Sequence, residues 1–541
     1  MENSQASLDL RNRQASFTAL REGEFDVLVI GAGITGCGVA RDAAMRGLRV
    51  ALVDACDIGA GTSSRSSKLI HGGLRYLAMG DLFVVREAAV ERRTLRKIAP
   101  HLAATTSVLV PVRGKMELTK MRTGMWTYEK LGDVEPHERH EVWELARLRQ
   151  EEPRVVTEVV TGAVVYPEYV TDDARLTLAN ARSAAAHGAR VVTYAPAVRM
   201  IEEGGRLVGA VVRGNLPGES EEAEVRARVI VNAAGPWVDA VRLLEDRDAG
   251  QKIQLTKGIH LVVPHTRLPI RHTIIMNTPD RRSIFAVPRE QFVYIGTTDT
   301  FFETPEYWPE ITREDADYLL DTVNASFGVE PITDEDILAT WSGLRPVLWA
   351  EGKKPSEISR RHEIMEGTGG MLTIAGGKLT SYRSMAERVV DRCEERLDRD
   401  LTPATTAEEP LPGGDFSGTF EELSSFVQAQ GLTPEEADRV IRMYGKEAFA
   451  VFAEKKGVAA EVRQAVLNEG ALTLEDFWFR RSSRARFSTD TRLPDLETAA
   501  EHMGELLGWS ASEKERQIEA CRGKRDLEMR CLEPLREAAH S

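Results

Sequence analysis

The hydrophobic pattern near the start of the chain predicts a strand, a glycine turn, a helix and a second strand. Residues 25–30 (FDVLVI) are almost continuously apolar, as expected of a parallel strand covered on both faces. Residues 36–47 contain several small residues and end in glycine, which is typical of a helix packed closely on such a strand. Residues 48–54 (LRVALVD) supply the second apolar run, so the spacing indicates a βαβ unit.

Apolar runs and their breaks organise the following residues into alternating helices and strands. The pattern predicts helices over 81–99 and 171–188, a buried strand over 226–237, two strands about a polar turn over 284–299, and a second strand, glycine turn and helix over 371–397. Residues 59–76 are too rich in Gly and Ser for the interior of an element, so we expect a loop there that could form part of a site. The alternation predicts an α/β protein with interleaved sheet and helix.

A change of composition near residue 410 divides the chain. Residues 402–415 are rich in Pro, Gly and Thr, which is typical of a linker, and residues 411–541 form a charged block with helical periodicity. We therefore expect a polar N-terminal arm (1–24), a mixed region (25–410) and a helical C-terminal domain (411–541), with a boundary near Pro410.

Composition and charge narrow the class of protein. The 541 residues and 60.0 kDa allow roughly three to four domains of about 150 residues. The formal net charge of -14 argues against a nucleic-acid partner, and the five cysteines lack the spacing of a metal site or a disulfide framework. The N-terminal segment lacks the apolar core of a secretion signal, and the most apolar stretch, 25–40, is too short to span a membrane. We expect a cytoplasmic protein without a metal.

The turn between the first two strands carries the pattern GxGxxG. Gly31 permits the tight turn, Gly33 lets a pyrophosphate approach the backbone, and Gly36 permits close packing of the helix. The N-terminus of that helix attracts phosphate, and Asp54 at the end of the second strand can hold the hydroxyls of a ribose. This context predicts a dinucleotide site, but by itself it does not distinguish FAD from NAD.

Segments spread in order along the chain resemble the FAD-dependent glycerol-3-phosphate dehydrogenases. They are residues 62–76 (TSSRSSKLIHGGLRY), 231–239 (VNAAGPWVD), 296–299 (GTTD), 341–346 (WSGLRP), 375–383 (AGGKLTSYR) and, before the helical tail, 410–416 (PLPGGDF). The resemblance implies three parts: a discontinuous Rossmann-like FAD-binding domain (about 25–100, 155–250 and 360–400), a mixed-sheet substrate domain (about 101–154 and 251–359) and a C-terminal helical domain.

The resemblance also implies an activity. We expect oxidation of sn-glycerol 3-phosphate to dihydroxyacetone phosphate by hydride transfer to FAD, with electrons passed to a membrane quinone and the protein peripheral on the inner face of the cell membrane. A homodimer is compatible with it. The alternatives are a glycerol-3-phosphate oxidase that uses oxygen, an amine or amino-acid oxidase of the same fold, and a non-catalytic FAD-stabilised scaffold or RNA-modification partner. The number of matching cationic positions disfavours the amine oxidase.

Cofactor contacts follow from the resemblance, residue by residue. Besides Gly31, Gly33, Gly36 and Asp54, the matching positions are Thr62, Ser63, Ser64, Ser67 and Lys68 along the flavin, Gly235, Pro236 and Trp237 at the dinucleotide, and Gly376, Gly377, Lys378, Leu379 and Thr380 on the other side of the ring.

Substrate contacts are carried over in the same way, because a phosphate dianion needs guanidinium or ammonium partners. Arg345 and Arg360 match phosphate ligands, although Arg361 makes the second assignment ambiguous. The positions Lys378, Arg75 and Tyr76 match residues nearer the flavin ring.

Oxidation of an alcohol needs a group that accepts the hydroxyl proton, and histidine is the natural candidate. His71 and His260 both match family positions near the flavin, and we rank His71 first. The hypothesis is that His71 takes the proton while Arg345 and Lys378 stabilise the developing alkoxide.

A run of aromatic and basic residues lies in the C-terminal part. Residues 477–487 (FWFRRSSRARF) interleave aromatics with Arg480, Arg481, Arg484 and Arg486. Such a run could contact anionic lipid, or it could form a docking face on the catalytic domain.

Overall fold

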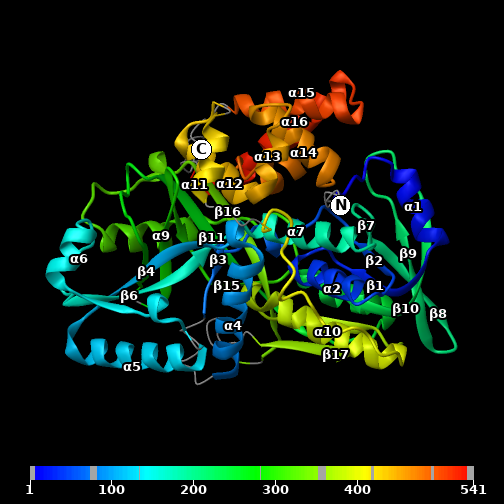
Figure 1. Cartoon of the computed structure of the whole chain (residues 1–541), viewed down its shortest axis with the longest axis horizontal. Coiled ribbons are helices and arrows are strands. Elements are labelled where there is room, and N and C mark those ends of the chain that lie inside the picture. Colours follow the sequence, from blue (N-terminus) through cyan, green and yellow to red (C-terminus); the bar gives the residue numbers. More distant parts are fainter. Residues whose placement is uncertain are drawn as a thin grey trace, which may run out of the picture.

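Two β-sheets lie beside each other, and helices from the C-terminal part of the chain cover one side of them (Figure 1). The computed structural model describes residues 7–72, 82–132, 134–278, 280, 282–350, 352, 361–415, 420–429, 431–488 and 493–532. The fold is the predicted α/β fold, with a dinucleotide-binding type of sheet, a mixed sheet and a C-terminal group of helices.

The first sheet has a parallel centre. Among the described residues its path runs β17-β18-β10-β1-β2-β7, and β9 and β8 extend it as antiparallel strands from β10. In the register of the parallel strands, Val27 of β1 lies opposite Val50 of β2 on one side and Val229 of β10 on the other. The strands are β1 (Glu24–Ile30), β2 (Val50–Val53), β7 (Arg190–Val192), β8 (Ala197–Glu203), β9 (Arg206–Arg213), β10 (Glu222–Asn232), β17 (His362–Glu366) and β18 (Leu372–Gly376).

Helices α2 (Ile34–Met45), α7 (Asp173–Ala186) and α10 (Tyr382–Leu397) cover one face of this sheet. Small residues on α2 allow it to pack closely against both other helices, and the shared core is buried. The other face is covered in part by α1 (Arg13–Glu22), whose Phe17 and Leu20 are fully buried. The segment expected to be a polar arm therefore contains a helix, because two apolar residues three positions apart give it a packing face.

The second sheet is mostly antiparallel. Its path among the described residues runs β15-β11-β14-β13-β12-β4-β6-β3, with β16 paired to β11 and β5 to β6. The strands are β3 (Leu69–Ile70), β4 (Ala104–Val112), β5 (Glu141–Glu144), β6 (Gly162–Val170), β11 (Ile253–Pro264), β12 (Thr273–Asn277), β13 (Ser283–Arg289), β14 (Phe292–Gly296), β15 (Thr300–Phe302) and β16 (Ala339–Leu348). Around it lie α4 (Leu82–Ile98), α5 (Gly114–Gly132), α6 (Leu145–Glu151) and α9 (Arg313–Ser326), whereas α8 (Val238–Glu245) packs on β8, β10 and β18 of the first sheet.

The C-terminal helices form two apolar cores of their own. They are α11 (Phe420–Ala429), α12 (Pro434–Tyr444), α13 (Ala448–Val451), α14 (Gly457–Asn468), a π-helix (Asp476–Arg481), α15 (Pro494–Leu507) and α16 (Ala511–Met529). The domain limits expected from the sequence, including the boundary near Pro410, stay predictions. Among the described residues, none of the helices combines the length and apolar character that crossing a bilayer requires.

Most elements predicted from hydrophobic periodicity are confirmed, but the strand expected over 226–237 ends at Asn232 (β10), and the loop expected over 59–76 contains the short strand β3. The βαβ unit forms with β1 and β2 in parallel, and the second strand, glycine turn and helix is β18 followed by α10. The helices expected over 81–99 and 171–188 are α4 and α7, and the paired strands over 284–299 are β13 and β14.

Candidate active site

A cavity of about 1240 Å³ lies where the two sheets meet. Its wall takes residues from the turn after β1, the loop after β2, the end of β10 and the turn after β18 in the first sheet. From the second sheet it takes residues of β4, β13 and β16, together with one face of α5. This volume is larger than the pockets of about 300–1,000 Å³ that hold single small ligands. The cavity is therefore large enough for a dinucleotide together with a small substrate.

The glycines of the first turn are required by close contacts. Gly31 has φ +109, and a Cβ there would lie 2.6 Å from the carbonyl oxygen of Ala233. A Cβ at Gly36 would lie 1.8 Å from the carbonyl oxygen of Gly31. Gly31 and Gly33 line the cavity, whereas Gly36 lies behind them, where it allows α2 to pack on the turn. The N-terminus of α2 consequently faces the cavity, at the end of the helix where backbone N–H groups have no partner within the helix itself.

Asp54 also lines the cavity, at the end of β2. Its carboxylate accepts hydrogen bonds from the backbone N–H groups of Ala32 (2.5 Å) and Cys56 (2.8 Å). Burial raises the pKa of this carboxyl to about 6, and the two backbone bonds oppose that rise. The side chain is thus fixed beside the glycine turn, in the geometry that a ribose ligand requires.

The residues of the loop after β2 that were expected to lie along a flavin fall into two groups. Thr62, Ser63 and Ser67 line the cavity, and the Ser63 hydroxyl accepts a hydrogen bond from the N–H of Ile34 at 2.9 Å. The Ser64 side chain and the Lys68 ammonium point away from the cavity. Lys68 is buried in an ion pair with Asp173. Neither of these two residues lines the cavity, and their contact with the flavin stays a prediction; in the structure Lys68 fixes the loop, because a buried ammonium needs a carboxylate partner.

Two further turns complete the wall on the side of the first sheet. Gly235, Pro236 and Trp237 line the cavity after β10, and Trp237 stacks on Tyr307 with ring centroids 4.2 Å apart. After β18 the lining residues are Gly376, Gly377, Lys378 and Leu379. Thr380 is buried behind them and exchanges hydrogen bonds of 3.3 Å with the backbone of His71. These contacts join the turn after β18 to His71, directly after β3.

Two of the cationic residues expected to bind substrate lie in the wall of the same cavity. Arg345 on β16 and Lys378 both line the cavity. The Arg345 guanidinium donates to Thr297 Oγ1 at 2.9 Å and contacts Asp299 Oδ1 at 3.3 Å, and its side chain keeps 27% of its surface exposed. Its orientation is thus set, and part of the guanidinium faces the open space. Arg75, Tyr76 and Arg360 lie outside the described residues and stay predictions.

The two candidate histidines occupy different positions. His71 lines the cavity. His260 is 1% exposed, stacks on Trp341 with centroids 4.5 Å apart, and its Nε2 lies 3.0 Å from Ser67 Oγ. Burial lowers the pKa of His260 well below its usual value, and Arg345 and Lys68 add to this effect. His260 is therefore a neutral residue one layer behind the cavity, in contact with it through Ser67.

Several ionisable residues of the cavity were not singled out from the sequence. Arg282 donates from Nη1 to the backbone oxygen of Asp299 at 3.0 Å, so two guanidinium groups meet at Asp299. Glu168 accepts from the N–H of Gly72 at 2.9 Å, and burial raises its pKa. The further charged residues in the wall are Arg65, Glu117 and Lys120. A local signal existed for Asp299, in the GTTD segment, and for Arg65, in the segment 62–76; the others reach the cavity through long-range strand and helix packing.

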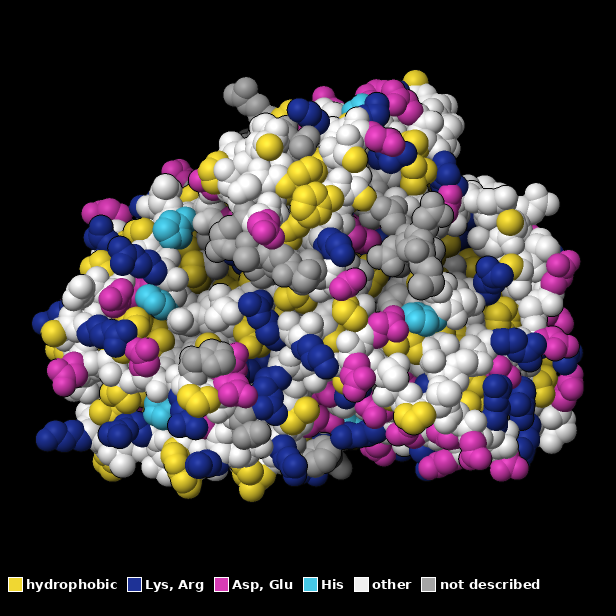
Figure 2. Space-filling view, viewed as in Figure 1, with side chains coloured by type: hydrophobic (Ala, Val, Ile, Leu, Met, Phe, Trp, Pro, Cys, Tyr) yellow, Lys and Arg dark blue, Asp and Glu magenta, His cyan; other side chains and the backbone are white. Residues whose placement is uncertain are grey.

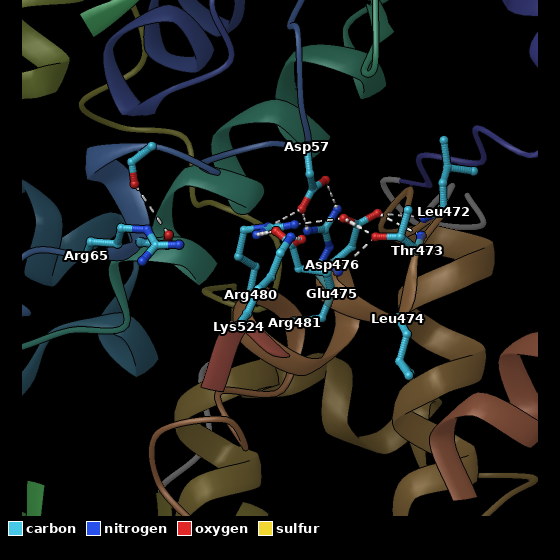
Figure 3. A network of polar contacts seen from close by, with 12 residues as sticks. Asp57, Arg65, Leu472, Thr473, Leu474, Glu475, Asp476, Arg480, Arg481 and Lys524 are labelled. Carbon is cyan, nitrogen blue, oxygen red and sulfur yellow. Dashed lines mark hydrogen bonds and ion pairs between the residues drawn. The ribbon is translucent and has the colours of Figure 1, made fainter. Parts of the chain in front are cut away.

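The arginine-rich run at 477–487 is buried. Arg480, Arg481 and Arg486 are 2%, 1% and 3% exposed, and Arg484 pairs with Glu461. The expectation that this run contacts lipid is corrected, because guanidinium groups paired with buried carboxylates cannot reach a membrane surface. The alternative, a docking face on the catalytic domain, agrees with the structure: Arg480 and Arg481 both contact Asp57 in the loop after β2 (Figure 3).

A parallel sheet with this glycine turn, terminal carboxylate and large cavity defines a dinucleotide-dependent enzyme of the Rossmann-like class. The family described as FAD dependent oxidoreductase matches residues 26–383, and the C-terminal domain of alpha-glycerophosphate oxidase matches residues 404–514. Aerobic glycerol-3-phosphate dehydrogenases from Staphylococcus haemolyticus and Bacillus subtilis are each 37% identical to this chain; the matches cover 94% of this chain and 95% and 96% of theirs.

Solved structures agree with these matches. The glycerol-3-phosphate dehydrogenase from Bacillus halodurans, complexed with FAD, superposes with a TM-score of 0.81 at 31% identity, over 97% of this chain and 99% of that one. The L-alpha-glycerophosphate oxidase from Mycoplasma pneumoniae shares the fold, with a TM-score of 0.57 at 17% identity over 72% of this chain and 99% of that one. The chain therefore belongs to the family of FAD-dependent aerobic glycerol-3-phosphate dehydrogenases.

The cavity fits FAD on its own geometry. Gly31, where a Cβ would collide with the backbone of Ala233, keeps the turn tight, and Gly33 lines the cavity without a side chain, which allows the close backbone approach that a pyrophosphate needs. Asp54 and the N-terminus of α2 would supply the ribose and phosphate partners, and Gly376 to Leu379 face the same space from the turn after β18. FAD is the cofactor of this enzyme.

Proposed function

We propose that the protein oxidises sn-glycerol 3-phosphate at C2 to dihydroxyacetone phosphate and passes the electrons to a membrane quinone. The observation that carries the substrate assignment is the position of Arg345 and Lys378 in the wall of the dinucleotide cavity. A partly exposed guanidinium held by Thr297 and Asp299 suits a phosphate dianion, which takes two parallel hydrogen bonds from such a group. The names of the curated relatives support the same substrate.

Each residue then has a separate role in the reaction. When bound, FAD supplies the two-electron acceptor in this cavity. Arg345 binds the phosphate and so orients C2 of the substrate. His71 accepts the proton of the C2 hydroxyl, and Lys378 stabilises negative charge that develops on that oxygen. Ser67, in contact with His260, fixes the wall beside them.

Turnover with a chosen substrate tests this proposal. The holoenzyme and an artificial electron acceptor are incubated separately with sn-glycerol 3-phosphate, glycine and proline, and the products are identified by mass spectrometry. We expect dihydroxyacetone phosphate from the first and no turnover of the amines. Turnover of an amine alone would replace the proposal with the amine or amino-acid oxidase alternative.

The exposed surface of helix α5 supports the proposal that the electron acceptor lies in the membrane. One face of α5 lines the cavity through Glu117, Lys120, Met121 and Gly124. Elsewhere on the helix Met116 and Trp126 are 85% and 59% exposed, among exposed basic residues. Apolar and basic side chains also project at the lower left of the molecule, where Figure 1 places α5 (Figure 2). A helix with this surface suits anionic lipid, and a quinone arriving there would be next to the cavity.

Vesicle flotation tests the role of α5. We expect the holoenzyme to float with vesicles that contain phosphatidylglycerol, and the double variant Met116→Ser, Trp126→Ser to float several-fold less. Phe449→Ser is the matched control, because Phe449 is also exposed (42%) but lies on α13 in the C-terminal part. Equal loss in the control, or none in the α5 variant, would remove α5 from membrane contact.

The acceptor is tested by reoxidation of the substrate-reduced enzyme. We expect a soluble quinone analogue to restore the flavin absorbance much faster than oxygen at equal concentration, with little peroxide released. Faster recovery with oxygen and stoichiometric peroxide would instead establish the oxidase, the function after which the family of the C-terminal segment is named.

A further inference from the structure

The loop between β2 and β3 (residues 54–68) forms much of the cavity wall, yet it is held in place by the C-terminal helices. Asp54, Thr62, Ser63 and Ser67 of this loop line the cavity. In between, Asp57 is fully buried, does not line the cavity, and points toward the π-helix (Figure 3). The loop that meets the cofactor is thus joined to the part of the chain most distant in sequence.

Asp57 is the centre of the first set of contacts between this loop and the C-terminal helices. Its carboxylate accepts from Arg480 Nε at 2.5 Å and from Arg481 Nη2 at 2.8 Å, and Arg481 Nη1 makes a third contact. Arg480 also donates to Asp476 at 2.8 Å, and Arg481 donates to the backbone oxygen of Glu469 at 2.8 Å. The two guanidinium groups hold the pKa of Asp57 below its usual value despite burial. Both arginines are therefore fixed by hydrogen bonds within the C-terminal part, and both bind the same carboxylate of the loop.

A second set of contacts with the C-terminal helices lies further along the same loop. Arg486 donates to the backbone oxygen of Ser64 at 2.8 Å. Arg65 lines the cavity, lies 3.8 Å from the ring centroid of Trp308, and contacts Glu528 of α16 at 3.2 Å. Glu528 also contacts Arg486 at 3.4 Å. Residues of the C-terminal part thus contact the loop at Asp57, Ser64 and Arg65.

Ion pairs of this kind do little for net stability, because the desolvation of buried charges offsets most of their attraction. They do fix position strongly, since a displaced member leaves a buried charge without a partner. We infer that the C-terminal helical domain is a cofactor clamp, in which Arg480, Arg481 and Arg486 are positioning residues that hold the loop 54–68 in the conformation that binds FAD. The inference depends on FAD binding and not on the identity of the substrate.

The clamp is tested with Arg481→Lys, which keeps the charge but removes the forked contact with Asp57. The matched control is Arg182→Lys. Arg182 is equally buried and forms a forked ion pair with Glu447 of the C-terminal part at 2.7 and 2.8 Å, but it does not line the cavity. For both full-length variants the FAD dissociation constant is measured by flavin fluorescence, and amide hydrogen exchange of residues 55–66 is followed in the holoenzyme.

We expect Arg481→Lys to raise the FAD dissociation constant at least about tenfold, or ~1.4 kcal/mol, and to speed exchange in 55–66. Arg182→Lys should lower the melting temperature to a similar degree but change FAD affinity less than about twofold. If Arg481→Lys does not fold, Arg486→Lys, which loses the contact with Ser64, takes its place with the same expectations. Unchanged FAD affinity in the clamp variant, or an equal loss in the control, would overturn the inference and leave the contacts as ordinary interdomain packing.

Discussion

The substitution Arg345→Lys tests the substrate assignment at the residue that carries it. Arg345 offers the planar fork that a phosphate accepts in two parallel hydrogen bonds, and lysine offers one point charge. A hydrogen bond to a charged group is worth about 1.5–3 kcal/mol, so loss of one of the two should lower kcat/KM for sn-glycerol 3-phosphate about 12- to 160-fold.

The effect on stability should be small. Arg345 keeps 27% of its side chain exposed, and its contact with Asp299 is long, at 3.3 Å, so the lost ion pair is worth less than about 1 kcal/mol. Arg267→Lys is the matched control, because Arg267 is 33% exposed, pairs with Asp336 and does not line the cavity. We expect the control to keep full activity.

Glycerol, which lacks the phosphate, separates binding of that group from general damage to the site. We expect Arg345→Lys to lower kcat/KM for glycerol 3-phosphate while kcat/KM for glycerol stays within about twofold of the wild type. Equal losses for both substrates, or no loss for either, would show that Arg345 does not bind the phosphate.

Three further substitutions test the site. Gly36→Ala places a methyl group 1.8 Å from the backbone oxygen of Gly31, so we expect most FAD to be lost during purification, whereas Gly523→Ala, which meets no atom within 4 Å, should keep it. Burial raises the pKa of Asp54 from 3.8 to about 6; its contribution to the stability of the apoprotein is therefore full below pH about 4 and lost as the pH rises through about 6. Denaturant unfolding should show the wild type losing up to about 3 kcal/mol relative to Asp54→Asn across that window, and parallel pH profiles would contradict the shift. His71→Ala should slow flavin reduction by about 100-fold or more, and a loss below tenfold would remove His71 from proton transfer.

Local chemistry made part of the fold and site predictable. The turn from Gly31 to Gly36 and the carboxylate of Asp54 lie within one βαβ unit, so hydrophobic periodicity and glycine spacing were sufficient to place them. Arg345 and Lys378 lie on different sheets, and only the resemblance of whole segments brought them to one site.

Other features depend on contacts between distant residues. The run at 477–487 has the composition of an exposed basic surface, but its arginines are buried because Asp57, Glu461 and Glu528 supply carboxylates from elsewhere in the chain. Likewise, Lys68 turns from the cavity because Asp173 lies behind it. Whether a basic side chain is buried or exposed depends on whether a carboxylate lies close to it in the fold. A short segment of sequence does not contain that distant partner.

Anaerobic mixing of the purified holoenzyme with sn-glycerol 3-phosphate tests the central claim most directly. We expect the flavin absorbance to bleach within one turnover and one equivalent of dihydroxyacetone phosphate to form for each flavin reduced. Fully oxidised flavin after mixing, with FAD demonstrably bound, would contradict the substrate assignment while leaving the family and the cofactor unaffected.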